Sequence, residues 1–199
     1  QKPVAPFPRL RIYAYAFGRK RPDLFNQRGE AIAGQYGGSQ FGLIAQLPLA
    51  RRGPWINLRL ASAPNVSRES EVGIGIGWQP KSSLPVSGII ERRMRPYGAD
   101  RWAVLAVLSP NEIKIGKNVA ISAYSQSGAT IGKGGVPFFD AQIGLHKKFK
   151  PAENLDVKLG VGSWSGGQDK SYRIDVGPAV AIDLRLKQAN LHLGVDCRF

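Results

Sequence analysis

The stretch Tyr172-Arg173-Ile174-Asp175-Val176-Gly177-Pro178-Ala179-Val180-Ala181-Ile182-Asp183-Leu184-Arg185-Leu186 places a large apolar residue at nearly every second position. The residues between them are small or charged, and the charged ones, such as Arg173 and Asp183, carry both signs. A period of two is typical of a β-strand, whereas a helix repeats about every 3.6 residues. The stretch therefore predicts a long strand with one apolar face and one face of small and charged residues.

The same alternation recurs along the chain and predicts about eleven strands. The sharpest further segments are Ile56–Ala61, Glu71–Trp78, Phe139–His146, Leu155–Gly162 and Leu191–Phe199, and the weaker ones are Leu10–Arg19, Gln40–Leu47, Val86–Arg93, Trp102–Leu108 and Val119–Gln126. With their flanking residues we expect strands of roughly nine to twelve residues, which is long enough to cross a bilayer at a tilt. Strands of soluble proteins usually have about five or six residues.

The composition is compatible with one folded domain of 199 residues. Hydrophobic residues make up 43%, which argues against disorder. No apolar run reaches the length of about eighteen residues that a transmembrane helix needs. The single cysteine, Cys197, excludes an internal disulfide and a cysteine-based zinc site. The mean hydropathy of −0.20 suits a soluble protein. A transmembrane β-barrel gives a similar value, because its apolar lipid-facing residues alternate with polar lumen-facing ones.

We expect an extended lead-in at residues 1–9, where Gln1–Pro8 holds three prolines, and a barrel domain at residues 10–199. Because the first residue is Gln1 instead of Met, we also expect a chain that does not start at its natural first residue, and removal of an upstream export signal stays open.

The connections between the predicted strands alternate in length, and the longest, Lys20–Ser39, belongs to the longer set. Long outer loops over short periplasmic turns are the pattern of outer-membrane barrels. An antiparallel ring with both ends on one side needs an even number of strands. We therefore expect an all-β, antiparallel up-and-down transmembrane β-barrel of about twelve strands. A barrel of about ten strands is the other possibility.

The alternative is a soluble basic β-sandwich or small barrel that binds a polyanion or a partner subunit. Its water-facing side would be rich in glycine and alanine, as at Gly73, Gly75, Ala179 and Ala181. Exposed strand glycines weaken a sheet, whereas inside a narrow barrel small residues make room for Arg and Asp side chains. Dependence on detergent distinguishes the two hypotheses.

The end of the chain, His192-Leu193-Gly194-Val195-Asp196-Cys197-Arg198-Phe199, resembles the assembly signal of bacterial outer-membrane proteins. His192, Gly194, Cys197 and Phe199 occupy its polar, glycine, hydrophobic and terminal aromatic positions. The resemblance implies that the barrel-assembly machinery is a partner.

The stretches Gly34–Gln40, Gly160–Gln168 and Arg173–Pro178 are similar to the C-terminal barrel region of a family of proteobacterial outer-membrane proteins. That region in turn resembles the barrels of phage-adsorption and cellulose-export proteins. The likeness runs from about Tyr13 to Phe199. It implies a location in the bacterial outer membrane, contact with lipid and lipopolysaccharide, and a role in exopolysaccharide export or as a surface receptor component. An anionic glycan and other subunits of an envelope complex are the further partners it suggests.

The same likeness implies another strand beyond Phe199, which would make the strand count even. The assembly signal instead places the end of the barrel at Phe199. Both interpretations stay open at this point, as does the merging of two strands into one in the count of about eleven.

Two glycine-rich motifs have structural explanations. Gly73-Ile74-Gly75-Ile76-Gly77 lies inside a predicted strand and not at the strand-to-helix turn of a phosphate loop. In the stretch from Gly162 to Gly166, Trp164 holds the position that the serine of G-x-S-x-G would need. Only two histidines are available, and no spacing supports a metal site. We therefore predict no enzyme, no catalytic residue, no metal and no cofactor.

The charged faces of the predicted strands are the candidate functional surface. An Arg or Lys at the bilayer midplane costs roughly 2–4 kcal/mol, so these residues must face the barrel interior and pair. The predicted lumen-lining residues are Arg59, Glu71, Glu91, Arg93, Asp140, His146, Lys158, Arg173, Asp175, Asp183, Arg185, His192, Asp196 and Arg198. They form either a salt-bridged plug or a charged pore, because a ring of about twelve strands is near the size at which an interior fills or conducts.

The net charge of +14 comes from 28 basic and 14 acidic residues, and much of the surplus lies at predicted strand ends and turns, as at Lys81, Lys114 and Lys147. Such rims suit lipid phosphates or anionic glycans. Aromatic residues also fall near predicted strand ends, as in an interfacial girdle. They are Tyr13, Tyr15, Trp55, Trp78, Trp102, Tyr124 and Tyr172. A nucleic-acid surface would instead gather basic and aromatic residues on one face, so nucleic acid is not an expected partner.

Overall fold

The computed structural model describes residues 9–19, 40–50, 53–62, 70–81, 83–96, 98–132, 135–168 and 171–199. The lead-in Gln1–Pro8 and the whole long connection Lys20–Ser39, with the motif residues Gly34–Ser39, lie outside these ranges. The described residues form strands and turns only, and they contain no helix that could cross a membrane.

Within the described ranges, twelve strands follow one another along the chain and join in one sheet. They are β1 (Leu10–Arg19), β2 (Gln40–Pro48), β3 (Trp55–Ser62), β4 (Glu71–Trp78), β5 (Val86–Met94), β6 (Arg101–Leu108), β7 (Ile113–Lys114), β8 (Val119–Ile131), β9 (Pro137–Ala152), β10 (Leu155–Gln168), β11 (Ser171–Arg185) and β12 (Ala189–Arg198). The expectation of an all-β barrel with about twelve strands is confirmed. β7 is a two-residue strand that pairs with the start of β8, and the other strands form the closed ring.

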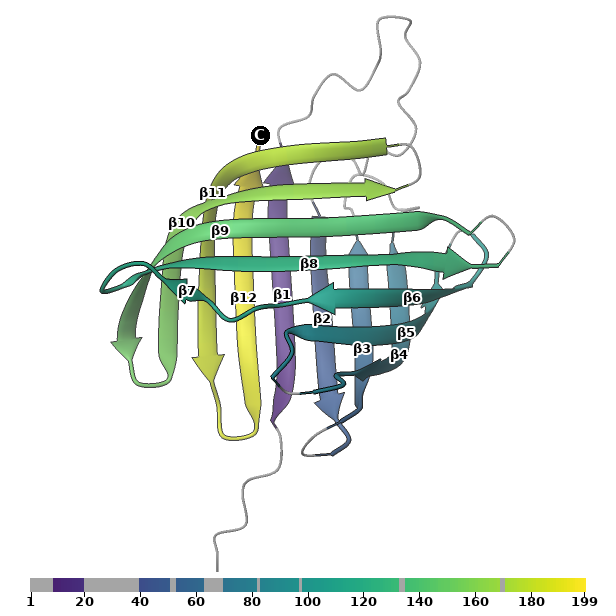
Figure 1. Ribbon diagram of the computed structural model, residues 1–199, viewed down its shortest axis with the longest axis horizontal. Helices are drawn as coiled ribbons and strands as arrows, with labels where there is room; N and C mark the ends of the chain where they lie inside the picture. The colour runs from purple at the N-terminus through teal and green to yellow at the C-terminus, as the bar shows by residue number, and fades with distance from the viewer. Residues whose placement is uncertain are drawn as a thin grey trace, which may run out of the picture.

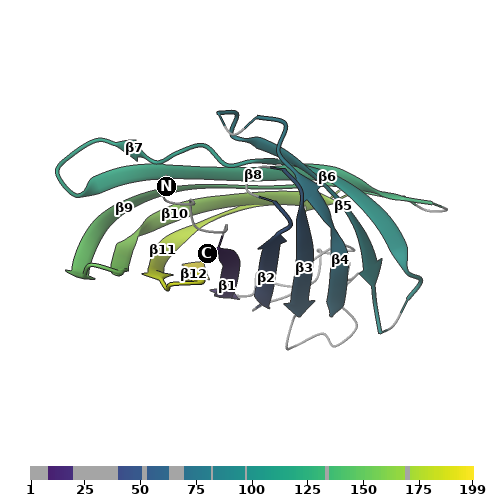
Figure 2. The same ribbon diagram turned by 90° about the horizontal axis from the view of Figure 1, so that it is seen from below.

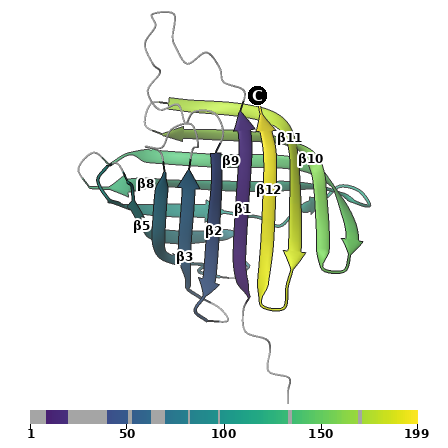
Figure 3. The same cartoon turned by 180° about the vertical axis from the view of Figure 1, so that it is seen from behind.

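The ring closes through a parallel pair, which an up-and-down antiparallel barrel does not have. β1 and β12 run in the same direction from Leu10↔Ala189 to Arg19↔Arg198, and Figure 3 shows them side by side with arrowheads pointing the same way. The other neighbours in the ring are antiparallel. An even number of strands is required only where every neighbouring pair in the ring is antiparallel. A parallel ladder also satisfies the backbone groups of both strands, so a ring with an odd number of strands can close.

The barrel is flattened into two layers whose strands cross steeply. In Figure 1, β6, β8 and β9 run across the front, while β12, β1, β2 and β3 run behind them. Figure 2, seen from below, shows the two layers separated, with β10 and β11 bending from one into the other. Strong strand tilt is what allows a sheet of this size to close on itself.

The strands of the two halves differ in length. β3, β4 and β6 have 8 residues each, whereas β9 has 16 and β11 has 15. The ends of β8 and β10 lie outside the predicted strands Val119–Gln126 and Leu155–Gly162: β8 runs to Ile131, and β10 runs to Gln168. Their glycines and serines carry no clear alternation, but backbone pairing across both hairpins continues through them.

Apolar and polar side chains are distributed in the opposite sense to a soluble domain. The exposed hydrophobic residues on the outer face include Ile74 (48%), Ile76 (54%) and Val161 (57%). Buried positions include Glu91 (1%), Asn57 (2%) and Asp156 (5%). Buried hydrophobic residues exist, Ala103 and Leu105 among them, but the exposed apolar set is several times larger.

Three aromatic residues expected in an outer girdle point inward instead. Trp55 is buried at 8% and its ring lies over Gly77, where a Cβ would come within 2.2 Å of the ring. The Tyr15 ring covers Gly42 in the same way, at 2.3 Å from the Cβ that this glycine lacks. Tyr124 shares the inner face of β8 with buried Ala120 and Thr130. Glycines on the inner face thus make room for aromatic rings as well as for charged side chains. Trp78, Trp102 and Tyr172 are exposed, as expected for a girdle.

Candidate functional site

The structure places the predicted lumen-lining residues on the rows of side chains that turn away from the exposed aliphatic face. On β11, Asp175 is 8% exposed while its neighbours Ile174 and Val176 are 68% and 56% exposed. On β5, Glu91 is 1% exposed and Ile90 is 48% exposed. The charged side chains gather into three groups on the inner face.

The first group, the arginine–glutamate cluster, consists of Arg59, Glu71, Glu91, Arg93 and Arg95 on and just after β3, β4 and β5. Glu91 lies 3.3 Å from Arg59 Nε and 2.8 Å from Arg93 Nε. Arg59 also pairs with Glu71, whose second oxygen lies 2.7 Å from Arg95 Nε. These carboxylates therefore each bind more than one arginine.

Neighbouring residues support this cluster. Asn57 Nδ2 donates a hydrogen bond to Glu91 at 3.3 Å, and the Arg93 guanidinium lies 4.4 Å from the centre of the Phe138 ring. On β4, a Cβ at Gly73 would lie 3.2 Å from the Glu91 carboxylate. A larger residue at Gly73 would crowd this carboxylate.

The second group, the mouth network, lies toward the end of the barrel where the β2–β3, β4–β5, β9–β10 and β11–β12 turns are found, called the short-turn end below. Asp183 of β11 binds His192 of β12, with 2.5 Å between Asp183 Oδ1 and His192 Nδ1. The other oxygen of Asp183 lies 2.9 Å from Lys158 Nζ of β10. Lys158 in turn donates to Glu112, which lies 3.5 Å from His146 Nε2 of β9.

Glu112 comes from the connection between β6 and β7, not from the barrel wall. Burial alone would raise the pKa of its carboxyl, but the hydrogen bond and charge of Lys158, aided by Lys148, hold this pKa below the usual carboxyl value. Glu112 is therefore ionised at neutral pH and ties the connection to β10. Asp156 extends the network: it accepts a hydrogen bond from Arg185 at 3.1 Å and forms a salt bridge with Lys148 at 3.5 Å.

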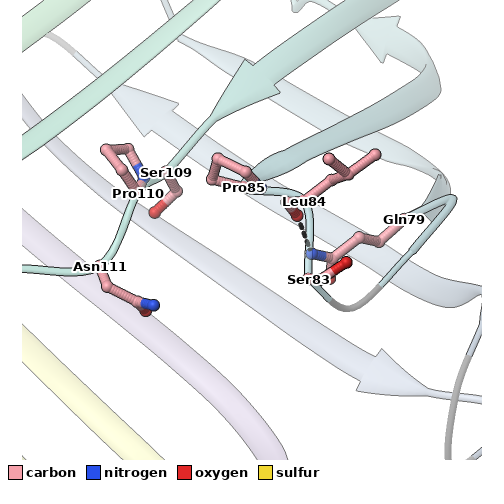
Figure 4. Close-up of a pocket in the computed structure, with 7 residues that line it drawn as sticks. All are labelled: Gln79, Ser83, Leu84, Pro85, Ser109, Pro110 and Asn111. Carbon is pink, nitrogen blue, oxygen red and sulfur yellow. Dashed lines mark hydrogen bonds between the residues drawn. The ribbon is translucent and has the colours of Figure 1, made fainter.

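The segment that carries Glu112 is also held at its other side. The Ser109 amide donates to the carbonyl oxygen of Pro85 at 2.8 Å, which joins it to the β4–β5 turn. Gln79 Nε2 donates to the carbonyl oxygen of Leu84 at 2.6 Å within that turn. Figure 4 shows the small open pocket between the turn and the segment, with a volume of about 170 Å³. The pocket is shallow and carries no charged side chain, so we assign it no ligand.

The third group, the arginine–aromatic cluster, joins the first and last strands. The Arg198 guanidinium lies 3.7 Å from the centre of the Phe17 ring and 4.8 Å from that of Trp164. Asp196 binds the same guanidinium at 3.0 Å. Phe17 and Arg198 meet because β1 and β12 are neighbours in the parallel pair.

The remaining predicted residues have separate places. Arg173 and Asp175 form a pair on β11 at 3.6 Å, and Asp140 lies on the inner row of β9. Of the residues proposed as an assembly signal, Gly194 pairs with Tyr15 and Ala181, and His192 belongs to the mouth network. Cys197 is exposed on the outer face, and Phe199 is 65% exposed while its backbone bonds twice to Val176.

The period of two along the strands did not identify several members of these groups. Glu112 and Arg95 lie in connections, where alternation gives no signal. Asp156 lies on the inner row of β10 and could have been found from the same period of two that identified Lys158. The contacts of Phe17 and Trp164 with Arg198 could not be predicted without knowing which strands are neighbours in the ring. Within the described ranges, no group of three or more His, Cys, Asp or Glu side chains is arranged to hold a metal ion.

No family model, no curated protein and no solved structure matches this chain. The functional argument therefore depends on the geometry described above and on the resemblances in the sequence.

Proposed function

We propose that this chain is an outer-membrane β-barrel that serves as a membrane anchor or as a narrow conduit. The observation that carries the proposal is the pairing of an aliphatic, exposed outer face with a charged, ion-paired inner face in a closed barrel. Water favours the opposite distribution, because each exposed aliphatic side chain loses roughly 1.5–3 kcal/mol of possible burial. A hydrocarbon environment removes this loss.

The inner face supports a narrow interior over a wide one. The cations of the three groups have carboxylate partners within 4 Å, and Glu112 reaches from the β6–β7 connection to β10. Paired charges leave little net field along the inner face, so strong ion selectivity from the wall is not expected. The proposal assigns no catalytic role to these residues.

For the finer role we propose exopolysaccharide export or surface-receptor function. Its support is the likeness of the stretches near Gly160–Gln168 and Arg173–Pro178 to barrels of that kind.

The membrane proposal is tested by solubility and electrophoresis. The folded protein should require detergent to stay monodisperse and should migrate differently on a gel before and after heating. Planar-bilayer recordings then separate the two roles: small, weakly selective currents indicate a conduit, and silent bilayers containing folded protein indicate an anchor. A monodisperse monomer without detergent would contradict the proposal.

A further inference from the structure

A ring of exposed cations surrounds the short-turn end of the barrel. Its described members, called the basic rim below, are Arg9, Arg11, Lys81, Lys114, Lys117, Lys147, Lys150 and Lys187. They come from the start of β1, the β4–β5 turn, β7 and the turn after it, the end of β9 and the β11–β12 turn. Since neighbouring strands of the ring reverse direction except at β1 and β12, all these positions lie at the same end.

The basic rim is not neutralised by the described part of the chain. No ion pair joins any basic-rim residue to a described carboxylate, and Glu153 is the one fully exposed acidic residue described at this end. Glu112 and Asp156 turn inward and are bound by Lys158, Lys148 and Arg185. The rim is therefore a source of positive potential separate from the paired inner face.

Exposed apolar side chains lie between these cations. Ile113 (64%) and Ile115 (56%) flank Lys114, and Leu186 (44%) precedes Lys187. The Lys147 ammonium lies 5.4 Å from the centre of the Phe149 ring, which is 40% exposed. Exposed cations alternating with exposed apolar side chains are the arrangement found at the headgroup level of a bilayer.

We propose that the basic rim binds the phosphate groups of anionic phospholipids in the leaflet at the short-turn end. The inference rests on the proposed membrane location and names the lipid partner of that end. An anionic polysaccharide would also meet the cations, but it would leave Ile113, Ile115 and Phe149 facing water. A leaflet accommodates the two kinds of side chain at once, with phosphates beside the lysines and acyl chains beside the aliphatic groups.

The test compares lipid preference in three proteins purified in detergent and inserted into vesicles. These are the unaltered chain, the variant Lys114→Gln/Lys117→Gln/Lys147→Gln, and the charge-preserving control Lys114→Arg/Lys117→Arg/Lys147→Arg. Vesicles contain phosphatidylcholine alone, or phosphatidylcholine mixed with phosphatidylglycerol or with lipid A. The relative affinity for each lipid is measured by native mass spectrometry or by competition with a brominated lipid that quenches tryptophan.

The unaltered chain and the arginine control should prefer phosphatidylglycerol over phosphatidylcholine, and the preference should weaken with salt. Each cation removed should reduce that preference by roughly fivefold. Equal preference in all three proteins, or a preference for lipid A that the glutamine variant keeps, would overturn the assignment while leaving the barrel in the membrane. Failure of every protein to enter any vesicle would instead contradict the proposed function itself.

Discussion

Asp183 and His192 lie opposite each other in the β11–β12 pair, and 2.5 Å separates Asp183 Oδ1 from His192 Nδ1. Charged and polar side chains on the same face of two neighbouring strands favour such a cross-strand contact. The structure adds Lys158 on the other side of Asp183, so one carboxylate links three neighbouring strands. Arg198 and Asp196, by contrast, pair with each other along β12.

Removing the Asp183 carboxylate should destabilise the barrel. Asp183→Ala leaves Lys158 and His192 without this partner, and we expect a loss of about 2 kcal/mol in the free energy of unfolding. Urea-induced unfolding in the same detergent measures it. Glu153→Ala, at an exposed position, is the control and should change stability by less than about 0.5 kcal/mol. If the two variants unfold alike, Asp183 is solvated and its contacts contribute nothing.

Glu91 should be the most sensitive charged residue of the arginine–glutamate cluster. It is 1% exposed and binds Arg59, Arg93 and Asn57. Glu91→Gln removes the charge at constant shape and should cost roughly 3–5 kcal/mol, because the partly buried guanidinium groups of Arg59 and Arg93 must then share Glu71 with Arg95. The double variant Glu91→Gln/Arg93→Met should regain part of the loss. A double variant that is less stable than the sum of the two single changes would contradict this account.

Two strand glycines should respond differently to the same substitution. In Gly77→Ala the new methyl group would meet the Trp55 ring at 2.2 Å, and overpacking of this kind typically costs about 1–3 kcal/mol. Gly88 lies on β5 with only the Leu105 carbonyl oxygen, at 3.9 Å, near its missing Cβ. Gly88→Ala should therefore be neutral or slightly stabilising. Equal unfolding midpoints for both variants would show that Trp55 does not lie over Gly77.

The link between Glu112 and Lys158 should give an acid-dependent contribution to stability. The folded-state pKa of Glu112 lies below its unfolded value of about 4.5, so the link contributes fully above that value. The contribution is lost as pH falls through the lower folded-state pKa. Unfolding measured against pH should show Glu112→Gln less stable than the unaltered chain at neutral pH and equal to it in strong acid. A stability difference that does not change with pH would argue against the ion pair.

Much of the fold could be predicted because its signal is local. The alternation from Tyr172 to Leu186 requires only that one side of a strand meet an apolar medium, and it correctly placed β11. The parallel closure could not be predicted, because pairing of β1 with β12 depends on the geometry of the whole ring. The two residues of β7 are too few for a periodic pattern.

The same difference between local patterns and long-range pairing applies to the residues of the candidate site. Charges on alternating strands, such as Arg59 and Asp183, were found from period alone. Glu112 was not predicted as a lumen residue, because its position depends on how the connection between β6 and β7 crosses the barrel end. Trp55 and Tyr15 were misplaced because an aromatic residue near a strand end suits either an outer girdle or an inner glycine, and only the opposite strand decides.

The central claim, that the aliphatic face meets lipid, is tested most directly by the environment of single side chains in vesicles. With Cys197 replaced by alanine, a nitroxide label is placed in turn at Ile74, Ile76 and Val161 on the outer face and at Ala179 and Ala181 on the inner face. Collision rates with oxygen and with a water-soluble nickel chelate are then compared by electron paramagnetic resonance. We predict that the outer positions favour oxygen and the inner positions do not. Nickel access at Ile74, Ile76 and Val161 equal to that of a label in water would contradict a membrane-spanning barrel.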